Sequence, residues 1–253
     1  MSPGRFDLDG RTALVTGAAR GLGGAIALAL AEAGADVACH GNRHAPTETA
    51  ARIEALGRKA AVLEGDLADG AIASQLVDKA SAALGDIDIL VNNAGIIRRA
   101  PAVESTDDDW QAVIDVNLTA VYRLCRAAGQ RMLARGRGKI VNISSLLAFQ
   151  GGIRVPAYAA SKGAVAQLTK ALANEWAGLG VNVNAIAPGY IRTENTSALV
   201  ADPTRNRQIL ERIPAGRWGE PGDLGGAAVF LSSRASDYVS GHVLVVDGGW
   251  LGR

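Results

Sequence analysis

The chain has few cysteines, almost no net charge and no long apolar run. Only Cys39 and Cys125 occur, far apart and without metal-ligand spacing, so they are predicted to be buried apolar residues of a protein from a reducing compartment. The formal net charge of +1 gives no electrostatic reason to expect nucleic acid or an anionic membrane as a partner. No apolar stretch approaches the roughly 18 residues of a membrane span, and the polar amino terminus does not resemble a signal peptide. We therefore expect a cytoplasmic protein without a metal site.

Strand-like and helix-like segments alternate along the sequence. With 253 residues, 48% apolar and 20% charged, the chain has a soluble globular balance, and its length allows one domain over residues 1–253. The alternation predicts a single doubly wound Rossmann-type α/β domain, in which helices cover both faces of a seven-stranded parallel sheet. Ligands then bind at the carboxyl ends of the strands. The seven apolar runs span residues 12–17, 35–41, 60–66, 87–95, 139–144, 181–189 and 242–249.

A glycine-rich turn follows the first apolar run. Its glycines are Gly17, Gly21 and Gly23, and an Ala/Leu-rich helical pattern comes next. Glycines let the backbone approach a pyrophosphate closely, and the free amides at a helix N-terminus receive its negative charge. The spacing differs from G-x-G-x-x-G, and a plain strand-to-helix turn is the alternative. Its place after the first strand favours a dinucleotide site.

The segment after the second run bears on the choice between NAD and NADP. An acidic residue there accepts hydrogen bonds from the adenosine ribose, whereas Arg suits a 2′-phosphate. The sequence is CHGNRH, with no acid and with Arg43 close by. It therefore favours NADP, or the use of both cofactors.

Tyr158 and Lys162 are the first candidates for catalysis. Pro156 and the Ala-rich sequence after it predict a helix that starts near this proline, with residues 158 and 162 on one face. A neighbouring ammonium favours the phenolate, so Lys162 is expected to lower the pKa of Tyr158 toward neutrality and make it an acid/base group. Ser145, after an apolar run, is expected to hydrogen-bond a substrate oxygen. The alternative is an ordinary exposed helix in which Tyr and Lys fall four apart.

Two further segments depart from regular patterns. A long helical pattern over residues 107–135 is interrupted by Asn117, whose amide on a buried face is either satisfied locally or opens the helix to a chain of waters. Residues 190–217 are polar, contain Pro203 and Pro214, and lack a clean period. A long irregular excursion of this kind is often a lid over an active site.

Six motifs follow one another along essentially the whole chain, namely TGAARGLG, NNAG, Asn117, NISS, YAASK and APG. In this order they resemble the short-chain dehydrogenase/reductase family. The resemblance implies an oxidoreductase that uses NAD or NADP. It makes Tyr158 the general acid/base, Lys162 the group that lowers its pKa and holds the nicotinamide ribose, and Ser145 the group that orients the reacting oxygen. Asn117 would anchor a water of the proton relay.

The same resemblance assigns further residues to the cofactor. The pyrophosphate would lie on Gly17, Arg20, Gly21, Leu22 and Gly23. The adenosine side would meet Asp66, Leu67, Asn93 and Gly95, with Arg43 as the candidate for a 2′-phosphate. The nicotinamide side would meet Pro188, Gly189, Ile191 and Thr193, beside Tyr158 and Lys162.

Other stretches narrow the resemblance to one group of the family. NNAGIIRR, FQGGIRVP, NVNAIAPGY and IPAGRWGEP are similar to the 2-dehydro-3-deoxy-D-gluconate 5-dehydrogenases, also called 2-deoxy-D-gluconate 3-dehydrogenases. That group interconverts a keto group and a secondary alcohol on a deoxy sugar acid and is mainly associated with NAD, whose expected acidic residue is missing here. A sugar acid needs a cation for its carboxylate, and Arg binds carboxylates with two hydrogen bonds. The candidates for substrate contact are Arg98, Arg99, Gln150, Arg154 and Arg217, with Arg154 first because it lies between Ser145 and Tyr158.

Two alternative functions remain open, and the sequence also bears on the oligomeric state. The first alternative is a reductase of another carbonyl, such as a gluconate 5-keto group or a 3-oxoacyl thioester. The second is a dinucleotide-binding regulator without turnover, whose signature would be a broken Ser, Tyr or Lys. The helices around Asn117 and from Tyr158 to Gly178 carry apolar residues on more than one face, and the resemblance implies a homotetramer built through them and the carboxyl terminus.

Overall fold

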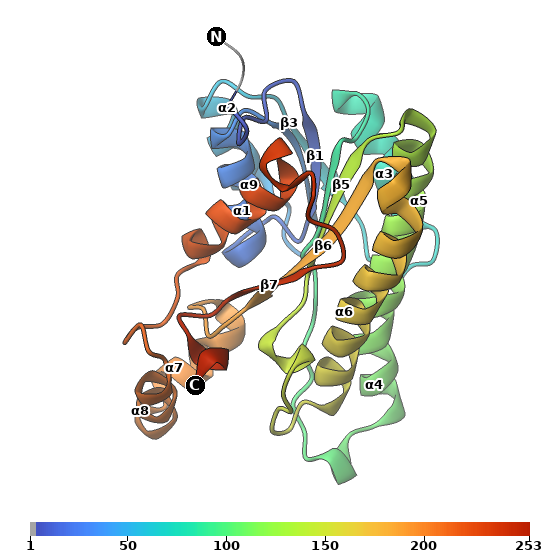
Figure 1. Cartoon of the computed structure of the whole chain (residues 1–253). Helices are drawn as coiled ribbons and strands as arrows, with labels where there is room; N and C mark the ends of the chain where they lie inside the picture. Colours follow the sequence, from blue (N-terminus) through green and yellow to red (C-terminus); the bar gives the residue numbers. More distant parts are fainter. Residues whose placement is uncertain (1–3) are drawn as a thin grey trace.

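The computed structural model describes residues 4–253 and contains a seven-stranded parallel sheet (Figure 1). The spatial order is β3-β2-β1-β4-β5-β6-β7, so the winding reverses between β1 and β4, as in a Rossmann-type sheet. The predicted fold class is therefore confirmed; residues 1–3 of the predicted domain lie outside the described residues. The strands are β1 (Thr12–Thr16), β2 (Asp36–Gly41), β3 (Ala60–Glu64), β4 (Ile89–Asn92), β5 (Gly138–Ile143), β6 (Val181–Pro188) and β7 (Val243–Val246).

Helices cover both faces of the sheet. The helices are α1 (Gly21–Glu32), α2 (Thr47–Ala55), α3 (Ile72–Leu84), α4 (Asp107–Ile114), α5 (Ala120–Arg135), α6 (Pro156–Trp176), α7 (Ser197–Ala201), α8 (Pro203–Arg212) and α9 (Gly225–Ser232). Buried side chains of α3, α5 and α6 pack on one face, and those of α1, α2 and α9 pack on the other (Figure 1). Within residues 4–253, no helix combines the length and the apolar character needed to cross a membrane.

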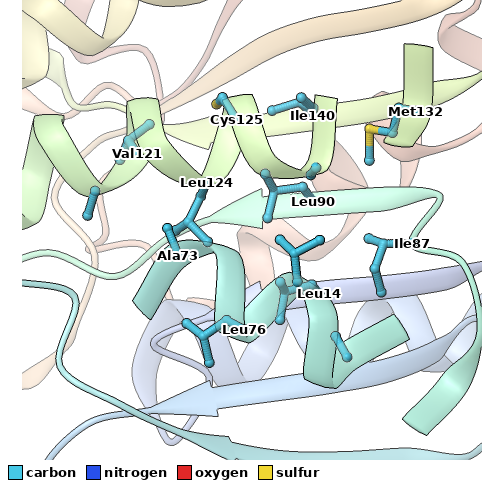
Figure 2. Packing of buried hydrophobic residues seen from close by; sticks show 14 of the residues in the cluster. Leu14, Ala73, Leu76, Ile87, Leu90, Val121, Leu124, Cys125, Met132 and Ile140 are labelled. Atoms are coloured by element: carbon cyan, nitrogen blue, oxygen red, sulfur yellow. The ribbon is translucent and has the colours of Figure 1, made fainter. Parts of the chain in front are cut away.

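The two cores follow from the alternation of side chains along each strand. Leu14 of β1 belongs to the core beneath α3 and α5, whereas its neighbours Ala13 and Val15 belong to the core beneath α1 and α9. Figure 2 shows the first core, where Leu14, Leu90 and Ile140 come from neighbouring strands. Two layers of helices are thus fixed on the sheet by strands that are apolar on both sides.

Both cysteines are buried, as predicted. Cys125 lies in the core beneath α5, and Cys39 lies in the core on the other face. Burial raises the pKa of each thiol to about 12, so both stay protonated and unreactive near neutral pH.

The helical pattern predicted over residues 107–135 is divided in the structure. Residues Asp115–Thr119 form a π-helical turn between α4 and α5, and Asn117 lies at its middle. A π turn inserts one residue into the helix and is frequent at functional sites. The interruption at Asn117 therefore marks a real change of helix geometry.

The expectation that residues 190–217 are irregular was wrong, because this segment contains helices α7 and α8. The carboxylate of Asp202 accepts hydrogen bonds from the backbone amides of Thr204 and Arg205 at 2.9 and 3.1 Å, which caps the start of α8. Pro203 occupies the first position of that helix, where proline needs no amide partner. The proline starts a helix here and does not break one.

Leu124→Ala should destabilise the protein by about 2–5 kcal/mol, because Leu124 is 1% exposed in the core under α5 and its loss leaves a cavity. Leu179→Ala is the matched control, since Leu179 is exposed and should change stability by less than about 0.5 kcal/mol. Urea unfolding of both variants measures the difference. Equal effects would contradict the assignment of Leu124 to the core.

Candidate active site

The glycine-rich turn between β1 and α1 is tightly packed at Gly17 and Gly23. A Cβ on Gly23 would lie 2.1 Å from the carbonyl oxygen of Gly17, and Gly17 itself has a φ of +65°. Only glycine meets both conditions at low cost. The Asn93 amide fastens this turn to the end of β4 by donating to the carbonyl oxygens of Thr16 and Gly17 at 2.9 and 3.2 Å.

The start of α1 fits a bound pyrophosphate. Arg20 is its N-cap residue and makes no side-chain cap, so the amides of Gly21, Leu22 and Gly23 donate no hydrogen bond to a capping side chain. Uncapped amides at a helix N-terminus attract anions. The sterically tight turn and the uncapped helix together form the kind of cradle that a dinucleotide requires.

The end of β2 supplies a cation and excludes an acid. A Cβ on Gly41 would lie 2.1 Å from the carbonyl oxygen of His44, so no carboxylate side chain can occupy this position without a shift of the backbone. Arg43 follows two residues later and is exposed. This arrangement suits a 2′-phosphate better than a ribose hydroxyl pair.

The residues expected around adenosine occupy the ends of β3 and β4. Asp66 is exposed, and its carboxylate accepts a hydrogen bond from the Ala68 amide at 3.0 Å. Leu67 is buried, and its side chain packs in the core, so its backbone is the part left to face a ligand. Gly95 lies beside the catalytic candidates, because a Cβ there would be 3.2 Å from Asn117 Oδ1 and 3.7 Å from Lys162 Nζ.

A pair of hydrogen bonds joins the end of β5 to α6. Lys162 Nζ donates to the Ile143 carbonyl oxygen at 2.7 Å, and the Ser144 hydroxyl donates to the Lys162 carbonyl oxygen at 3.0 Å. Lys162 Nζ lies 5.6 Å from the centre of the Tyr158 ring. The hydroxyl hydrogen of Ser144 is used in this contact. The Ser145 hydroxyl instead accepts from the Leu147 amide at 3.2 Å, so its own hydrogen remains available to donate. These contacts favour Ser145 over Ser144 as the serine that orients a reacting oxygen.

The pKa of Tyr158 is not brought toward neutrality in this structure, contrary to the expectation from the sequence. Burial raises the pKa of Tyr158 above its ordinary value, and the groups that oppose this rise are the Ser145 hydroxyl and the charge of Arg99. Burial also lowers the pKa of Lys162 to about 8. The phenol is therefore protonated at neutral pH, and the lysine is the first of the two to lose its proton as the pH rises.

Asn117 is buried and satisfied locally. Its Oδ1 accepts from the Ile96 amide at 2.8 Å, and its Nδ2 donates to the Ile96 carbonyl oxygen at 2.9 Å and to the Ser161 hydroxyl at 3.3 Å. The first alternative, local satisfaction, agrees with these contacts, and the helix forms a π turn around the residue. These contacts fix the segment after β4 against α6.

The residues expected on the nicotinamide side run from the end of β6 into the lid. Pro188 ends β6, and a Cβ on Gly189 would lie 2.5 Å from Asp247 Cα, which forces the chain to pass close to the end of β7. Ile191 is buried, and Thr193 begins the short helical turn Glu194–Thr196. Glu194 forms an ion pair with Arg20, so the segment after β6 lies against the glycine-rich turn.

The cationic candidates for substrate differ in what already binds them. Arg217 donates two hydrogen bonds to Asp223 at 2.6 and 2.9 Å, which holds the pKa of that carboxyl at about 2, and Arg98 pairs with Asp109 at 3.2 Å. The Arg99 guanidinium donates to the Asn195 carbonyl oxygen at 3.2 Å and is close enough to Tyr158 to influence its titration. Arg217 is therefore already paired with a carboxylate in this structure, whereas Arg99, among residues 4–253, is bound only to a backbone carbonyl.

Arg154 and Gln150 lie on the loop between Ser145 and α6. Arg154 is exposed, and among residues 4–253 it is the one residue other than glycine with a positive φ, at 63°. Its carbonyl oxygen accepts from the Ala100 amide at 3.1 Å, which joins this loop to the segment that carries Arg99. Gln150 Oε1 accepts from Trp250 Nε1 at 3.2 Å, so its amide hydrogens stay available. Non-glycine residues with positive φ are uncommon, and such strain clusters at functional sites.

A family model described as enoyl-(acyl carrier protein) reductase matches residues 17–251. A 2-dehydro-3-deoxy-D-gluconate 5-dehydrogenase of Bacillus subtilis is 54% identical over 250 residues, which cover 98% of this chain and 97% of the relative. The chain is a member of the short-chain dehydrogenase/reductase family. The resemblance drawn from its motifs is confirmed, as is the similarity to the deoxygluconate group.

Solved structures of family members agree with the fold and bear on the cofactor. A structure from Agrobacterium tumefaciens, assigned as a 2-deoxy-D-gluconate 3-dehydrogenase with bound NADP, is 58% identical, with a TM-score of 0.92 and full coverage of both chains. A gluconate 5-dehydrogenase from Burkholderia cenocepacia in complex with NADP and tartrate is 44% identical, with a TM-score of 0.94 and full coverage of both chains. These family members hold NADP, one of the two cofactors expected from the sequence.

Several residues around this family site were not singled out by the sequence. The Thr16 hydroxyl accepts from the amides of Asn93 and Ala94 at 3.0 and 3.1 Å, and His40 lies beside the glycine-rich turn. Ser161 donates to the Tyr158 carbonyl oxygen at 2.8 Å. Each is polar within an apolar element, which was the available signal. Within residues 4–253, no three His, Cys, Asp or Glu side chains are grouped to hold a metal ion.

Gly23→Ala should abolish dinucleotide binding, because the added Cβ would collide with the carbonyl oxygen of Gly17 and deform the cradle. Gly163→Ala is the matched control, since a Cβ on this α6 glycine has nothing within 4 Å. Fluorescence titration with NADP and with NAD compares the two variants. Retention of wild-type affinity by Gly23→Ala would contradict the assignment of the turn.

Proposed function

We propose that the protein interconverts a keto group and a secondary alcohol on a deoxy sugar acid, as a 2-dehydro-3-deoxy-D-gluconate 5-dehydrogenase or 2-deoxy-D-gluconate 3-dehydrogenase, with NADP or NAD as cofactor. The observation that carries this proposal is an intact set of Ser145, Tyr158 and Lys162 with the charge of Arg99 acting on Tyr158, in a chain more than half identical to such enzymes. A regulator without turnover would not need this set. The bound dinucleotide supplies or accepts the hydride.

Proton transfer at the substrate oxygen is proposed for Tyr158. In reduction the phenol donates its proton to the carbonyl oxygen as the negative charge develops there, and in oxidation the phenolate takes the proton of the alcohol. The raised pKa favours the donor form at neutral pH. Ser145 donates a hydrogen bond to the same oxygen and orients it, and the charge of Lys162 stabilises the phenolate once the proton has left.

Lys162 and Asn117 are proposed to support this transfer from behind the tyrosine. With the Lys162 ammonium held on Ile143, its remaining hydrogens can bind the nicotinamide ribose hydroxyls. The Asn117 side chain is fully engaged with Ile96 and Ser161, so the backbone of its π turn is the part that anchors a relay water.

The cofactor is proposed to lie along the cradle described above, with NADP preferred. Gly17, Arg20, Gly21, Leu22 and Gly23 would hold the pyrophosphate. Asp66, Leu67, Asn93 and Gly95 would line the adenosine side, and Pro188, Gly189, Ile191 and Thr193 would line the nicotinamide side. Arg43, beside the sterically closed Gly41, would bind the 2′-phosphate.

The substrate carboxylate is proposed to bind Arg99 and Arg154. The charge of Arg99 acts on Tyr158, so this arginine supplies a cation near the proposed proton donor. Arg154 lies on the loop that is joined to the Arg99 segment through Ala100. Gln150 has free amide hydrogens for a substrate hydroxyl.

We also propose a cytoplasmic homotetramer. The two buried thiols without a disulfide suit a reducing compartment. Trp110 of α4 and Tyr122 of α5 are large side chains that remain more than 40% exposed in the single chain, and helices of this region would pack on a second copy. Light scattering of the purified protein tests the subunit number.

Absorbance of the reduced nicotinamide tests the proposed function directly. The purified protein is given NAD or NADP with 2-deoxy-D-gluconate, D-gluconate or a neutral deoxy sugar. Fast turnover with the deoxy sugar acid and NADP is expected, with D-gluconate and the neutral sugar slower. Preference for D-gluconate would make the protein a gluconate dehydrogenase, and silence across the panel with dinucleotide still bound would overturn the substrate class.

Tyr158→Phe should lower kcat by at least about a hundredfold, the usual contribution of a general acid. Dinucleotide binding should change little, because the ring and its packing remain. Steady-state kinetics and a separate binding titration measure the two effects. Retention of most of kcat would remove Tyr158 from the acid/base role.

The rate of keto reduction should fall as the pH rises through about 8. Lys162 loses its proton there, whereas burial keeps the Tyr158 phenol protonated. The loss of the ammonium removes stabilisation of the phenolate that forms during reduction. A profile of kcat/KM between pH 6 and 10 measures this, and a rate that stays level to pH 10 would contradict the assigned pKa order.

Arg99→Ala and Arg154→Ala should each raise KM for the sugar acid about tenfold or more, since each removes a charged hydrogen-bond donor. The KM of a neutral analogue should change much less. Arg98→Ala is the control, because Arg98 is already paired with Asp109. Equal effects on charged and neutral substrates would exclude the arginine concerned as a carboxylate partner.

A further inference from the structure

His40 is a buried titratable side chain to which the proposed chemistry gives no role. It lies near the carboxyl end of β2, is 1% exposed, and has Thr16 of β1 and Leu63 of β3 as its strand partners. Histidine is seldom buried without polar partners, because its ring nitrogens need hydrogen bonds. The hydrogen-bond partners of its two ring nitrogens therefore indicate which segments the side chain connects.

The imidazole bridges two segments of the dinucleotide cradle. Its Nδ1 lies 3.5 Å from the amide nitrogen of Gly17, and its Nε2 lies 3.0 Å from the carbonyl oxygen of Gly65. A carbonyl oxygen only accepts, so Nε2 carries the hydrogen and Nδ1 is left as the acceptor for Gly17. The His40 carbonyl oxygen also accepts from the Ala18 amide at 2.8 Å. One neutral tautomer satisfies both ring contacts.

We infer that His40 is a positioning residue of the dinucleotide site, whose neutral imidazole fixes the glycine-rich turn at Gly17 relative to the Gly65–Asp66 segment. The inference rests on the proposed function only in that the dinucleotide binds this cradle. Gly17 would face the pyrophosphate and Asp66 the adenosine, so the imidazole sets the spacing between two contact points of one ligand. A preformed spacing improves affinity because less ordering is left to occur on binding.

Protonation would break this bridge on one side. An imidazolium has no lone pair on Nδ1 and cannot accept from the Gly17 amide. Burial lowers the pKa of His40, while the Gly65 carbonyl and the charge of Asp66 oppose that shift. Of the other charged groups near the cradle, Arg20 of the glycine-rich turn is paired with Glu194, and Arg43 beyond β2 is exposed. The imidazole is thus neutral at pH 7, and dinucleotide affinity should fall as the pH drops below the ordinary histidine value of about 6.5.

Three substitutions separate the two ring contacts. His40→Asn places an amide oxygen near the site of Nδ1 and keeps the acceptor for Gly17, His40→Gln reaches toward Gly65 without that acceptor, and His40→Leu removes both. His242→Asn is the matched control, since His242 is exposed and remote from the glycine-rich turn in the contacts it makes. The dissociation constant for NADP is measured by fluorescence titration at pH 7.5 without sugar acid, and Tm is recorded for each variant.

His40→Leu should bind NADP about tenfold more weakly than wild type, because it removes both contacts of the bridge, whereas the control should stay within about threefold of wild type. His40→Asn and His40→Gln each keep one contact and should fall between these two. Wild-type affinity in all three His40 variants, or equal weakening by the His242 control, would overturn the inference. If the Leu variant fails to fold, the Asn and Gln pair decides.

The pH series supplies a readout that a purely structural histidine would not move. The 2′-phosphate of NADP itself titrates at about 6. Wild type and His40→Asn are therefore compared at each pH, because the effect of phosphate protonation on affinity is the same for both proteins and cancels in their ratio. The pH series extends downward until the NMR signal of the His40 ring shows its protonation in the wild type. The ratio of wild-type to Asn dissociation constants should rise as the ring becomes protonated. A ratio that stays constant through that protonation would overturn the role of the neutral imidazole. If the NADP dissociation constants change as expected but the protein does not turn over a sugar acid, the result would instead count against the proposed substrate.

Discussion

A buried ammonium group holds the sheet and the catalytic helix together at the site. Lys162 is 4% exposed and donates to the Ile143 carbonyl oxygen, while Ser144 returns a hydrogen bond to the backbone of the same lysine. Removing an ammonium from water costs several kcal/mol, and a single carbonyl compensates for only part of this cost. The lowered pKa of Lys162, about 8, is the visible consequence. Tyr158 lies one helical turn before Lys162, and Ser145 lies one residue after Ser144. The hydrogen bonds of Lys162 and Ser144 therefore also fix the positions of Tyr158 and Ser145.

Departures from regular geometry gather around that contact. The π turn at Asn117, the positive φ of Arg154 and the closed glycine turn at Gly17 and Gly23 each cost stability locally. They are retained where the backbone must approach a ligand or where a loop must turn sharply beside the reacting group. The long apolar cores on both faces of the sheet tolerate this cost, since they depend on none of these positions.

Much of the fold could be predicted from the sequence because its signals are local. Short apolar runs fix the seven strands. The family that the motifs resemble has its serine thirteen residues before the tyrosine, which selects Ser145 over Ser144, whose hydroxyl is bound elsewhere. The pairing of Arg217 with Asp223 and the capped helix after Asp202 could not be predicted. Both depend on how the lid folds on itself, and a polar segment has no apolar period to reveal this.

The titration of the site was also beyond the sequence. Lys162 lies four residues after Tyr158 on the same helix, which places the two side chains near each other. Burial nevertheless raises the pKa of Tyr158 and outweighs the groups that lower it, which include Arg99 from the segment after β4. Burial and contacts between distant segments exist only in the folded chain. The site therefore combines residues that short motifs identify with an electrostatic environment that the fold creates.

The central claim is that Tyr158, Ser145 and Arg99 meet one sugar acid beside the dinucleotide. The most direct test is a crystal structure of the complex with NADP and 2-deoxy-D-gluconate. We expect the reacting oxygen within hydrogen-bond distance of Tyr158 Oη and Ser145 Oγ, with the carboxylate on Arg99. A sugar acid bound with its reacting oxygen away from Tyr158, or with its carboxylate far from Arg99, would contradict the account.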